Sequence, residues 1–179
     1  MSQQPNGIHH IAIMCGDIRK HIAFFSEVVG FPLVALFDMH GVPGGLHAFL
    51  RMNDFGYFSL VQLPDVDRIP IELGVTHSGS GAAPCAPGTL QHLAFRAANE
   101  KELIAMRDRI RSHGVNVVGP IDHGMCKSIY FAGPDRMTLE ETLAQNLTNP
   151  VGPSPGGPSG VEPRTGVEER NKHYVQPRG

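Results

Sequence analysis

The sequence predicts an α+β fold made of two βαβββ modules, which cover residues 7–63 and 90–145. Alternating apolar segments typical of strands surround one helical pattern, and this order occurs twice along the chain. Each module also begins with a similar segment that contains a histidine, His10 in HHIAI and His92 in QHLAF. Such self-similarity over tens of residues indicates an internal repeat.

The first module is predicted to hold one helix among four strands. Asp17 is placed to cap that helix, and Gly30 is placed to end it. Apolar residues recur between them at helical spacing: Ile18, Ile22, Phe25 and Val29. Strands are predicted over residues 7–13, 31–37, 47–52 and 57–63, because apolar residues alternate there and turn residues separate the segments.

The second module repeats this order. Its helix is predicted over residues 100–113, with Leu103, Met106 and Ile110 on one face and Gly114 at its end. Its strands are predicted over residues 90–97, 115–118, 127–132 and 138–143. We expect the twofold relation between the modules to bring their first strands side by side.

Two further segments differ in composition from the modules. The linker, residues 64–89, is rich in Gly, Pro and Ser, and a connection of this length tends to be functional or mobile. Residues 1–145 are therefore predicted to form one domain. Residues 146–179 are rich in Pro and Gly without apolar periodicity, and they form either a disordered tail or an extended arm on another surface.

The composition excludes several classes of function. The net charge of −2 offers no basic surface for nucleic acid, and no apolar run approaches the roughly 20 residues that span a bilayer. The three cysteines lack CxxC spacing, so we expect no disulfide framework and a reducing compartment. The N-terminus lacks the pattern of a secretory signal, and we expect a cytoplasmic protein.

Three residues form a candidate metal site. His10 and His92 occupy equivalent positions in the two modules, and Glu140 lies in the last predicted strand. Two imidazoles and one carboxylate form the facial triad that holds a divalent metal, commonly iron(II), and leaves other positions open. The counterpart of Glu140 in the first module lies near Ser59, and serine is a poor ligand. Three protein ligands are therefore predicted.

These segments resemble the vicinal oxygen chelate superfamily, also called the glyoxalase/bleomycin-resistance/dioxygenase fold, over roughly residues 7–145. The resemblance rests on HIAI with Asp17, on HLAF and on PDRMTLE. It implies that the modules build a cupped mixed sheet around one metal. Members of the superfamily include glyoxalases, epimerases, ring-cleaving dioxygenases and metal-free binding proteins, so membership alone does not define a reaction.

A more specific resemblance joins His123, Tyr130 and Glu140. In extradiol dioxygenases a histidine precedes an apolar-Tyr pair, and the ligand glutamate follows the tyrosine by ten residues, as it does here. The resemblance implies that Tyr130 bonds the substrate or an oxygenated intermediate and that His123 lines the pocket. It also implies an acid–base role for His77, fifteen residues before His92. A loop contact for His123, a structural role without catalysis for His77 and a core position for Tyr130 stay open as alternatives.

Two residues depart from that signature. Gly133 stands where an acidic or small polar residue is usual, and Arg136 stands where glycine usually makes the turn. An arginine at such a position is strained if its φ angle is positive. Neither residue is a predicted metal ligand. The departures therefore weaken the resemblance to extradiol dioxygenases and leave the predicted metal site unchanged.

The sequence thus predicts an enzyme, an iron(II)-dependent extradiol-type dioxygenase that cleaves a catechol-like or other vicinal-oxygen small molecule with O₂. The alternative is a glyoxalase- or epimerase-type isomerase or lyase, in which Mn(II), Zn(II), Ni(II) or Co(II) stabilises an enolate. A third class is a binding protein without catalysis. A homodimer is expected, and nucleic acid and membranes are not expected partners.

Overall fold

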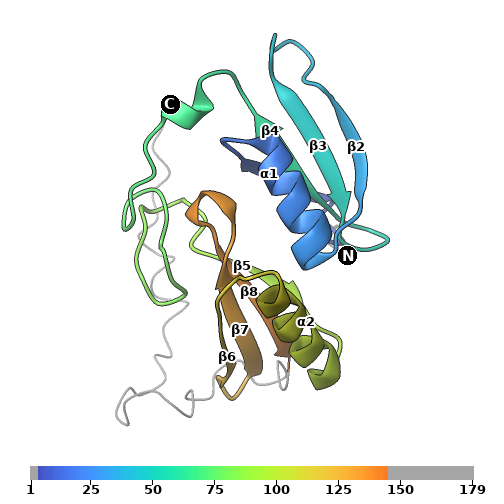
Figure 1. Cartoon of the computed structure of the whole chain (residues 1–179), viewed down its shortest axis with the longest axis vertical. Helices are drawn as coiled ribbons and strands as arrows, with labels where there is room; N and C mark the ends of the chain where they lie inside the picture. Colours follow the sequence, from blue (N-terminus) through green and yellow to red (C-terminus); the bar gives the residue numbers. More distant parts are fainter. Residues whose placement is uncertain (1–3, 145–179) are drawn as a thin grey trace.

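The computed structural model describes residues 4–144, which form two modules of similar construction (Figure 1). The first module contains β1 (His10–Met14), α1 (Ile18–Ala23), the π-helix η1 (Phe24–Val29), β2 (Leu33–Asp38), β3 (Leu46–Arg51) and β4 (Tyr57–Gln62). The linker carries the 3-10 helix η2 (Val66–Arg68). The predicted tail over residues 146–179 lies outside the described part of the chain.

The second module repeats the order of the first. It contains β5 (Leu93–Arg96), α2 (Glu100–Ser112), β6 (Val117–Asp122), β7 (Cys126–Ala132), the 3-10 helix η3 (Pro134–Arg136) and β8 (Thr138–Ala144). The prediction of an α+β fold made of two βαβββ modules is confirmed, with strand ends shifted by a few residues from the predicted limits.

Each module forms its own mixed sheet of four strands. The strand orders are β1-β4-β3-β2 and β5-β8-β7-β6, with the first strand of each module parallel to the last. In this register Ala12 pairs with Ser59, and Ala94 pairs with Glu140. Ser59 and Glu140 therefore occupy equivalent positions, as the sequence repeat predicts.

The expected pairing of the two modules is wrong in one respect. The first strands are not hydrogen-bonded neighbours, because β1 pairs with β4 and β5 pairs with β8 in separate sheets. The modules are joined through their helix-covered faces instead, where Phe95 of the second sheet contacts Phe31 and Phe58 of the first module. Buried apolar residues of both modules form one core.

The first helix also differs from the continuous α-helix that the sequence predicts. The side chain of Asp17 caps it as expected, by accepting from the backbone N–H groups of Arg19 and Lys20. After Ala23, however, the helix widens into a π-helix, and Gly30 ends it in the left-handed conformation. The wider turn lets Phe25, Val28 and Val29 all face the core.

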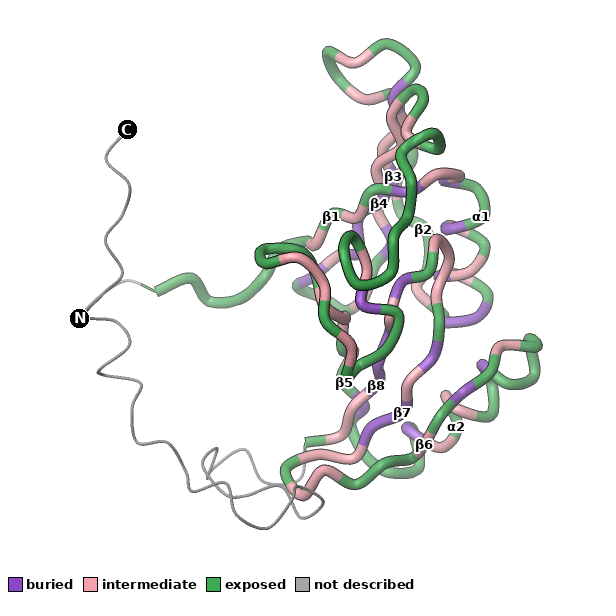
Figure 2. Tube along the Cα trace, turned by 90° about the vertical axis from the view of Figure 1, so that its left-hand side faces the viewer, coloured by how far each residue is buried: buried purple, intermediate pink, exposed green. Residues whose placement is uncertain are grey.

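Both helices lie on the same side of the two sheets (Figure 2). This arrangement leaves the other face of each sheet available for a site, and we call these the open faces. The open face of the first sheet carries Met14 and Phe37, whose side chains are each 47% exposed. No helix within residues 4–144 is long and apolar enough to cross a membrane.

A turn of the second module contacts the start of α1 in the first (Figure 1). Asp135 accepts a hydrogen bond from the backbone N–H of Gly16 at 2.7 Å, and its carboxylate lies 3.4 Å from Nε2 of the buried His21. Asp135 and Arg136 both have positive φ angles, 50° and 59°. The strain predicted for an arginine at this position is therefore present.

Candidate metal and ligand-binding site

His92 and Glu140 form a close pair on the open face of the second sheet. Glu140 pairs with Ala94 across β5 and β8, and His92 lies two residues before Ala94, so the side chains of His92 and Glu140 share a face. The Nε2 atom of His92 lies 3.0 Å from Oε2 of Glu140. The carboxylate side chain is 7% exposed and the imidazole is 35% exposed, so the pair is reachable from one side only.

The hydrogen bonds around His92 determine what this pair can bind. Its Nδ1 donates to the side-chain oxygen of Gln91, which leaves the lone pair of Nε2 directed toward the carboxylate. Two acceptor atoms at this distance need a proton or a cation between them. Two ligand atoms that are each about 2.1 Å from a metal, at a right angle, are about 3 Å apart. The pair therefore fits two adjacent positions on a divalent metal.

Gln91 connects His92 to the linker. Its side-chain amide donates to the backbone carbonyls of Ser80, Gly81 and Ala83, at 3.1, 3.2 and 2.8 Å. A residue that orients a ligand histidine in this way tunes its metal affinity. Sequence reasoning missed this role, although the position of Gln91 next to His92 was the available signal.

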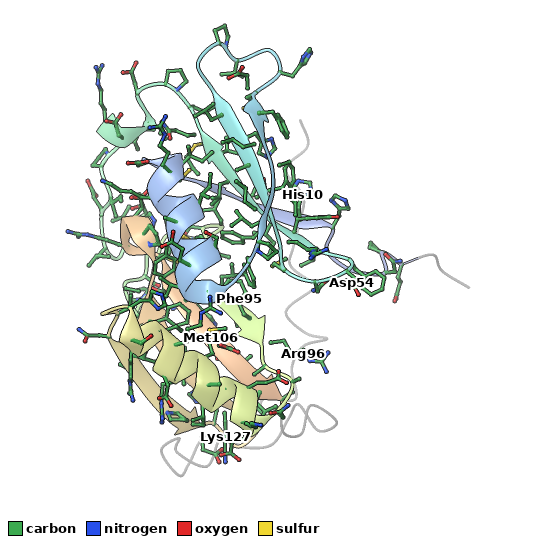
Figure 3. All side chains as sticks on the ribbon, turned by 45° about the vertical axis from the view of Figure 1, so that its right-hand side comes forward. His10, Asp54, Phe95, Arg96, Met106 and Lys127 are labelled. Carbon is green, nitrogen blue, oxygen red and sulfur yellow. The ribbon has the colours of Figure 1, made fainter. Side chains whose placement is uncertain are left out.

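His10 lies in the other module. It is exposed on β1, where its Nδ1 is hydrogen-bonded to Nδ1 of His9 at 2.9 Å and its ring lies against Phe49. Figure 3 shows His10 beside the first sheet, whereas Arg96 on β5 lies in the second module. No three His, Cys, Asp or Glu side chains gather as a metal site within the described residues of one chain. One chain thus brings together two of the three predicted ligands.

The first sheet has a different group at the position equivalent to Glu140. Ser59 is fully buried, and its hydroxyl is hydrogen-bonded to Nε2 of His47 at 2.6 Å. Burial lowers the pKa of His47, and the charge of His10 lowers it further. The neutral imidazole of His47 is thus favoured beside His10.

Tyr130 and His123 stand next to the His92–Glu140 pair. Tyr130 is paired with Glu140 across β7 and β8, and its hydroxyl lies 3.2 Å from Nε2 of His123. Burial raises the pKa of the phenol, and the carboxylate of Glu140 raises it further. Tyr130 therefore keeps its proton at neutral pH and can donate a hydrogen bond to a bound ligand.

A pocket of about 590 Å³ opens beside Tyr130 and His123, and the His92–Glu140 pair lies next to it without being among its described lining residues. The linker covers one side of it with residues 79–82, and β6, β7 and the start of β8 form the rest. His123 and Tyr130 both line it. Its volume is within the range of small-molecule sites.

The predicted acid–base residue His77 has a separate position. It lies on the linker, where its Nδ1 is hydrogen-bonded to the hydroxyl of Thr76 at 2.9 Å, and it is not among the residues that line the pocket. The structure thus gathers His92, Glu140, Tyr130 and His123. His10 lies in the other module, and the hydrogen bond of His77 is made to Thr76 and not to any of these four residues.

Comparison with known proteins gives a family for this arrangement. The sequence model of the Glyoxalase/Bleomycin resistance protein/Dioxygenase superfamily matches residues 7–140. The search of curated proteins gave no match.

Solved structures share the fold. A glyoxylase/bleomycin resistance protein/dioxygenase domain from Frankia sp. EAN1pec has a TM-score of 0.64 at 13% identity, covering 79% of this chain and 100% of its own. The antibiotic-binding protein TnmS3 from Streptomyces sp. CB03234 has a TM-score of 0.54 at 25% identity, with 80% and 100% covered. The fosfomycin resistance protein FosX from Listeria monocytogenes, solved with Mn(II) and sulfate, has a TM-score of 0.54 at 17% identity, with 83% and 100% covered.

Proposed function

Because the chain belongs to the Glyoxalase/Bleomycin resistance protein/Dioxygenase superfamily, we propose that it is a metal-dependent dioxygenase of the extradiol type. Its substrate is a catechol-like or other vicinal-oxygen small molecule, and O₂ is the second substrate. Iron(II) is the preferred metal, with Mn(II), Zn(II), Ni(II) and Co(II) as the alternatives. We also expect the cytoplasm as its compartment, since the three cysteines, Cys15, Cys85 and Cys126, are free thiols.

One observation carries the proposal: the hydrogen-bonded His123 and Tyr130 lie on the face that presents the His92–Glu140 pair. When bound, the metal would supply a Lewis-acid centre with open positions for two substrate oxygens and O₂. His123 lines the pocket beside Tyr130, where its imidazole can pass a proton to or from a substrate oxygen. Tyr130 can donate a hydrogen bond that orients a substrate oxygen.

A third ligand must come from outside this pair, and we propose that it is His10 of a second copy in a homodimer. His10 is exposed, and its Nε2 makes no hydrogen bond with another residue of the described chain. The open face of the first sheet around it also carries exposed apolar residues, Met14 and Phe37, which are each 47% exposed. A partner that covers this face would bury that surface and could bring His10 to the His92–Glu140 pair of the other copy.

Two other functions make distinct predictions. An isomerase or lyase of the same fold would use the metal to stabilise an enolate and would need no O₂. A binding protein would use the apolar pocket without turnover, and the similarity to the antibiotic-binding TnmS3 favours it as the second candidate.

The test is the metal content of anaerobically purified protein, followed by oxygen uptake with a panel of catechols. The proposal predicts about one iron per chain, O₂ consumption and a yellow ring-opened product. Oxygen-independent turnover restored by zinc, nickel or cobalt would favour the isomerase. Tight ligand binding with neither metal nor turnover would favour the binding protein.

A further inference from the structure

Among the described residues that line the pocket, Arg136 is the only lysine or arginine, and none of them is Asp or Glu. No hydrogen bond or ion pair joins its guanidinium to another residue within the described part of the chain. The carboxylate of the preceding residue, Asp135, is engaged by Gly16 and His21 instead. An exposed arginine whose guanidinium is unpaired, at the edge of a small-molecule pocket, is available to a ligand. Guanidinium groups bind carboxylates through two parallel hydrogen bonds.

Arg136 is held in a strained backbone conformation. Its φ angle of 59° follows another positive φ angle at Asp135, in a conformation that residues with a Cβ rarely adopt. The contacts of Asp135 with Gly16 and His21 fix this turn against the first module. Strained residues that the surrounding structure holds in place are concentrated at ligand sites.

The rest of the pocket is suited to an apolar ligand body. Leu73, Val118 and Ile121 line it, and they are all at least partly exposed. Gly81 lies so close to the ring of Tyr130 that a Cβ there would stand 2.9 Å from it. The linker therefore packs directly on this ring, which is an aromatic part of the pocket lining against which a flat ligand can stack.

The positions of Arg136 and Glu140 also limit the length of a ligand that reaches both residues. Glu140 is four positions after Arg136 in the sequence, which corresponds to at most about 13 Å between their backbones. A ligand with its charged group at Arg136 would place its other end near Tyr130 and the His92–Glu140 pair.

We propose that the pocket binds an aromatic carboxylate, with the carboxylate on Arg136 and the ring toward Tyr130. The identification of the ring as the reacting end rests on the proposed function. The recognition of the carboxylate does not, because it involves neither the metal nor O₂.

The test is the binding of 2-naphthoate and of its neutral isostere 2-naphthamide to the full-length protein. Both probes are fluorescent, and the chain has no tryptophan to interfere. We expect the wild-type protein to bind naphthoate at least tenfold more tightly than naphthamide. Arg136→Gln should remove this preference and leave naphthamide binding unchanged, which also shows that the variant is folded. Arg136→Lys should retain part of the preference.

Arg68→Gln is the matched control, because Arg68 is an exposed arginine that is paired with Asp65 and does not line the pocket. It should behave like the wild type. Equal affinity for both probes, failure of both to bind, or a preference that survives Arg136→Gln would overturn the proposal. If the preference for naphthoate were lost in Glu140→Gln instead of Arg136→Gln, the carboxylate of the probe would bind at the metal, and the proposal would also be overturned. Loss of O₂ uptake or metal with the preference intact would contradict the proposed function alone.

Discussion

Glu140 and Glu141 are neighbouring carboxylates on opposite faces of β8, and their environments differ accordingly. Glu140 faces the pocket side and contacts His92. Glu141 is 7% exposed and faces α2, where burial, and then the charge of Glu102, raises its pKa from 4.5 to about 7. The negative charge of Glu140 can be neutralised by a bound metal, whereas the negative charge of Glu141 is buried and lowers the stability of the fold.

The raised pKa of Glu141 makes the stability of the protein depend on pH. The folded state binds the proton more tightly than the unfolded chain, so the stability is fully present below about pH 4.5 and falls as pH rises to 7. We expect Glu141→Gln to raise the free energy of unfolding at pH 8 by on the order of 2 kcal/mol and to change it little at pH 4.5. Urea unfolding at both pH values measures this.

Glu27→Gln is the control for this prediction, because Glu27 is an exposed carboxylate. Glu27→Gln should leave the difference in the free energy of unfolding between pH 4.5 and pH 8 at its wild-type value. An equal effect of Glu141→Gln at both pH values would show that the carboxyl titrates normally.

Tyr130→Phe tests the hydroxyl beside the candidate metal site. The ring should keep its packing against Gly81, and metal content should stay at the wild-type level, because Tyr130 is not a ligand. Loss of the hydrogen-bond donor should lower kcat by roughly 100-fold with the best catechol, which is the lower end for a group that assists proton transfer. A normal rate with normal metal content would assign Tyr130 a packing role.

At this scale the sequence predicts a site at His92, Glu140, Tyr130 and His123, from the repeat and from a resemblance within one module, and the structure places these four residues close together. Their role as a site stays a prediction. The sequence could not identify Gln91, because the role of Gln91 depends on the path of the linker. It noted Arg136 only as a departure from a motif, since the pocket that gives the residue a use is formed by segments far apart in the sequence.

Among the elements, the linker is the one that shapes the site. The backbone carbonyls of Ser80, Gly81 and Ala83 accept hydrogen bonds from Gln91, and Gly81 packs on Tyr130. We expect Gly81→Ala to push the linker away from the ring and to weaken naphthoate binding several-fold, with little change in the melting temperature. Titration and thermal unfolding measure the two effects.

Gly88→Ala is the matched control for space, because a Cβ at Gly88 meets no atom within 4 Å. Its positive φ angle of 89° means that it should lower stability without the loss of affinity. If Gly81→Ala binds naphthoate as the wild type does, the contact with Tyr130 does not shape the pocket.

The strands and α2 were predictable because apolar periodicity and capping residues determine them locally. The π-helix after Ala23 was not, since apolar residues at 18, 22, 25 and 29 fit an ordinary α-helix as well. The wider turn follows from packing Phe25 against Phe58 of β4, a contact between distant parts of the sequence.

At the scale of the whole molecule, the two similar modules of one chain could pack against each other in more than one way. The repeat predicts their similarity, but their relative placement depends on contacts such as Phe58 with Phe95 and Asp135 with Gly16. This placement separates His10 from His92 and Glu140 within one chain. The account therefore depends on a second copy to complete the metal site.

The most direct test mixes two inactive variants. His10→Ala and Glu140→Ala should each lose stoichiometric metal when pure, because each breaks every site of its homodimer. After unfolding and refolding together in equal amounts, half of the dimers are mixed, and each mixed dimer holds one intact site. Metal content should then recover to about a quarter of the wild-type value. No recovery, or full metal in pure His10→Ala, would contradict a site shared between two copies.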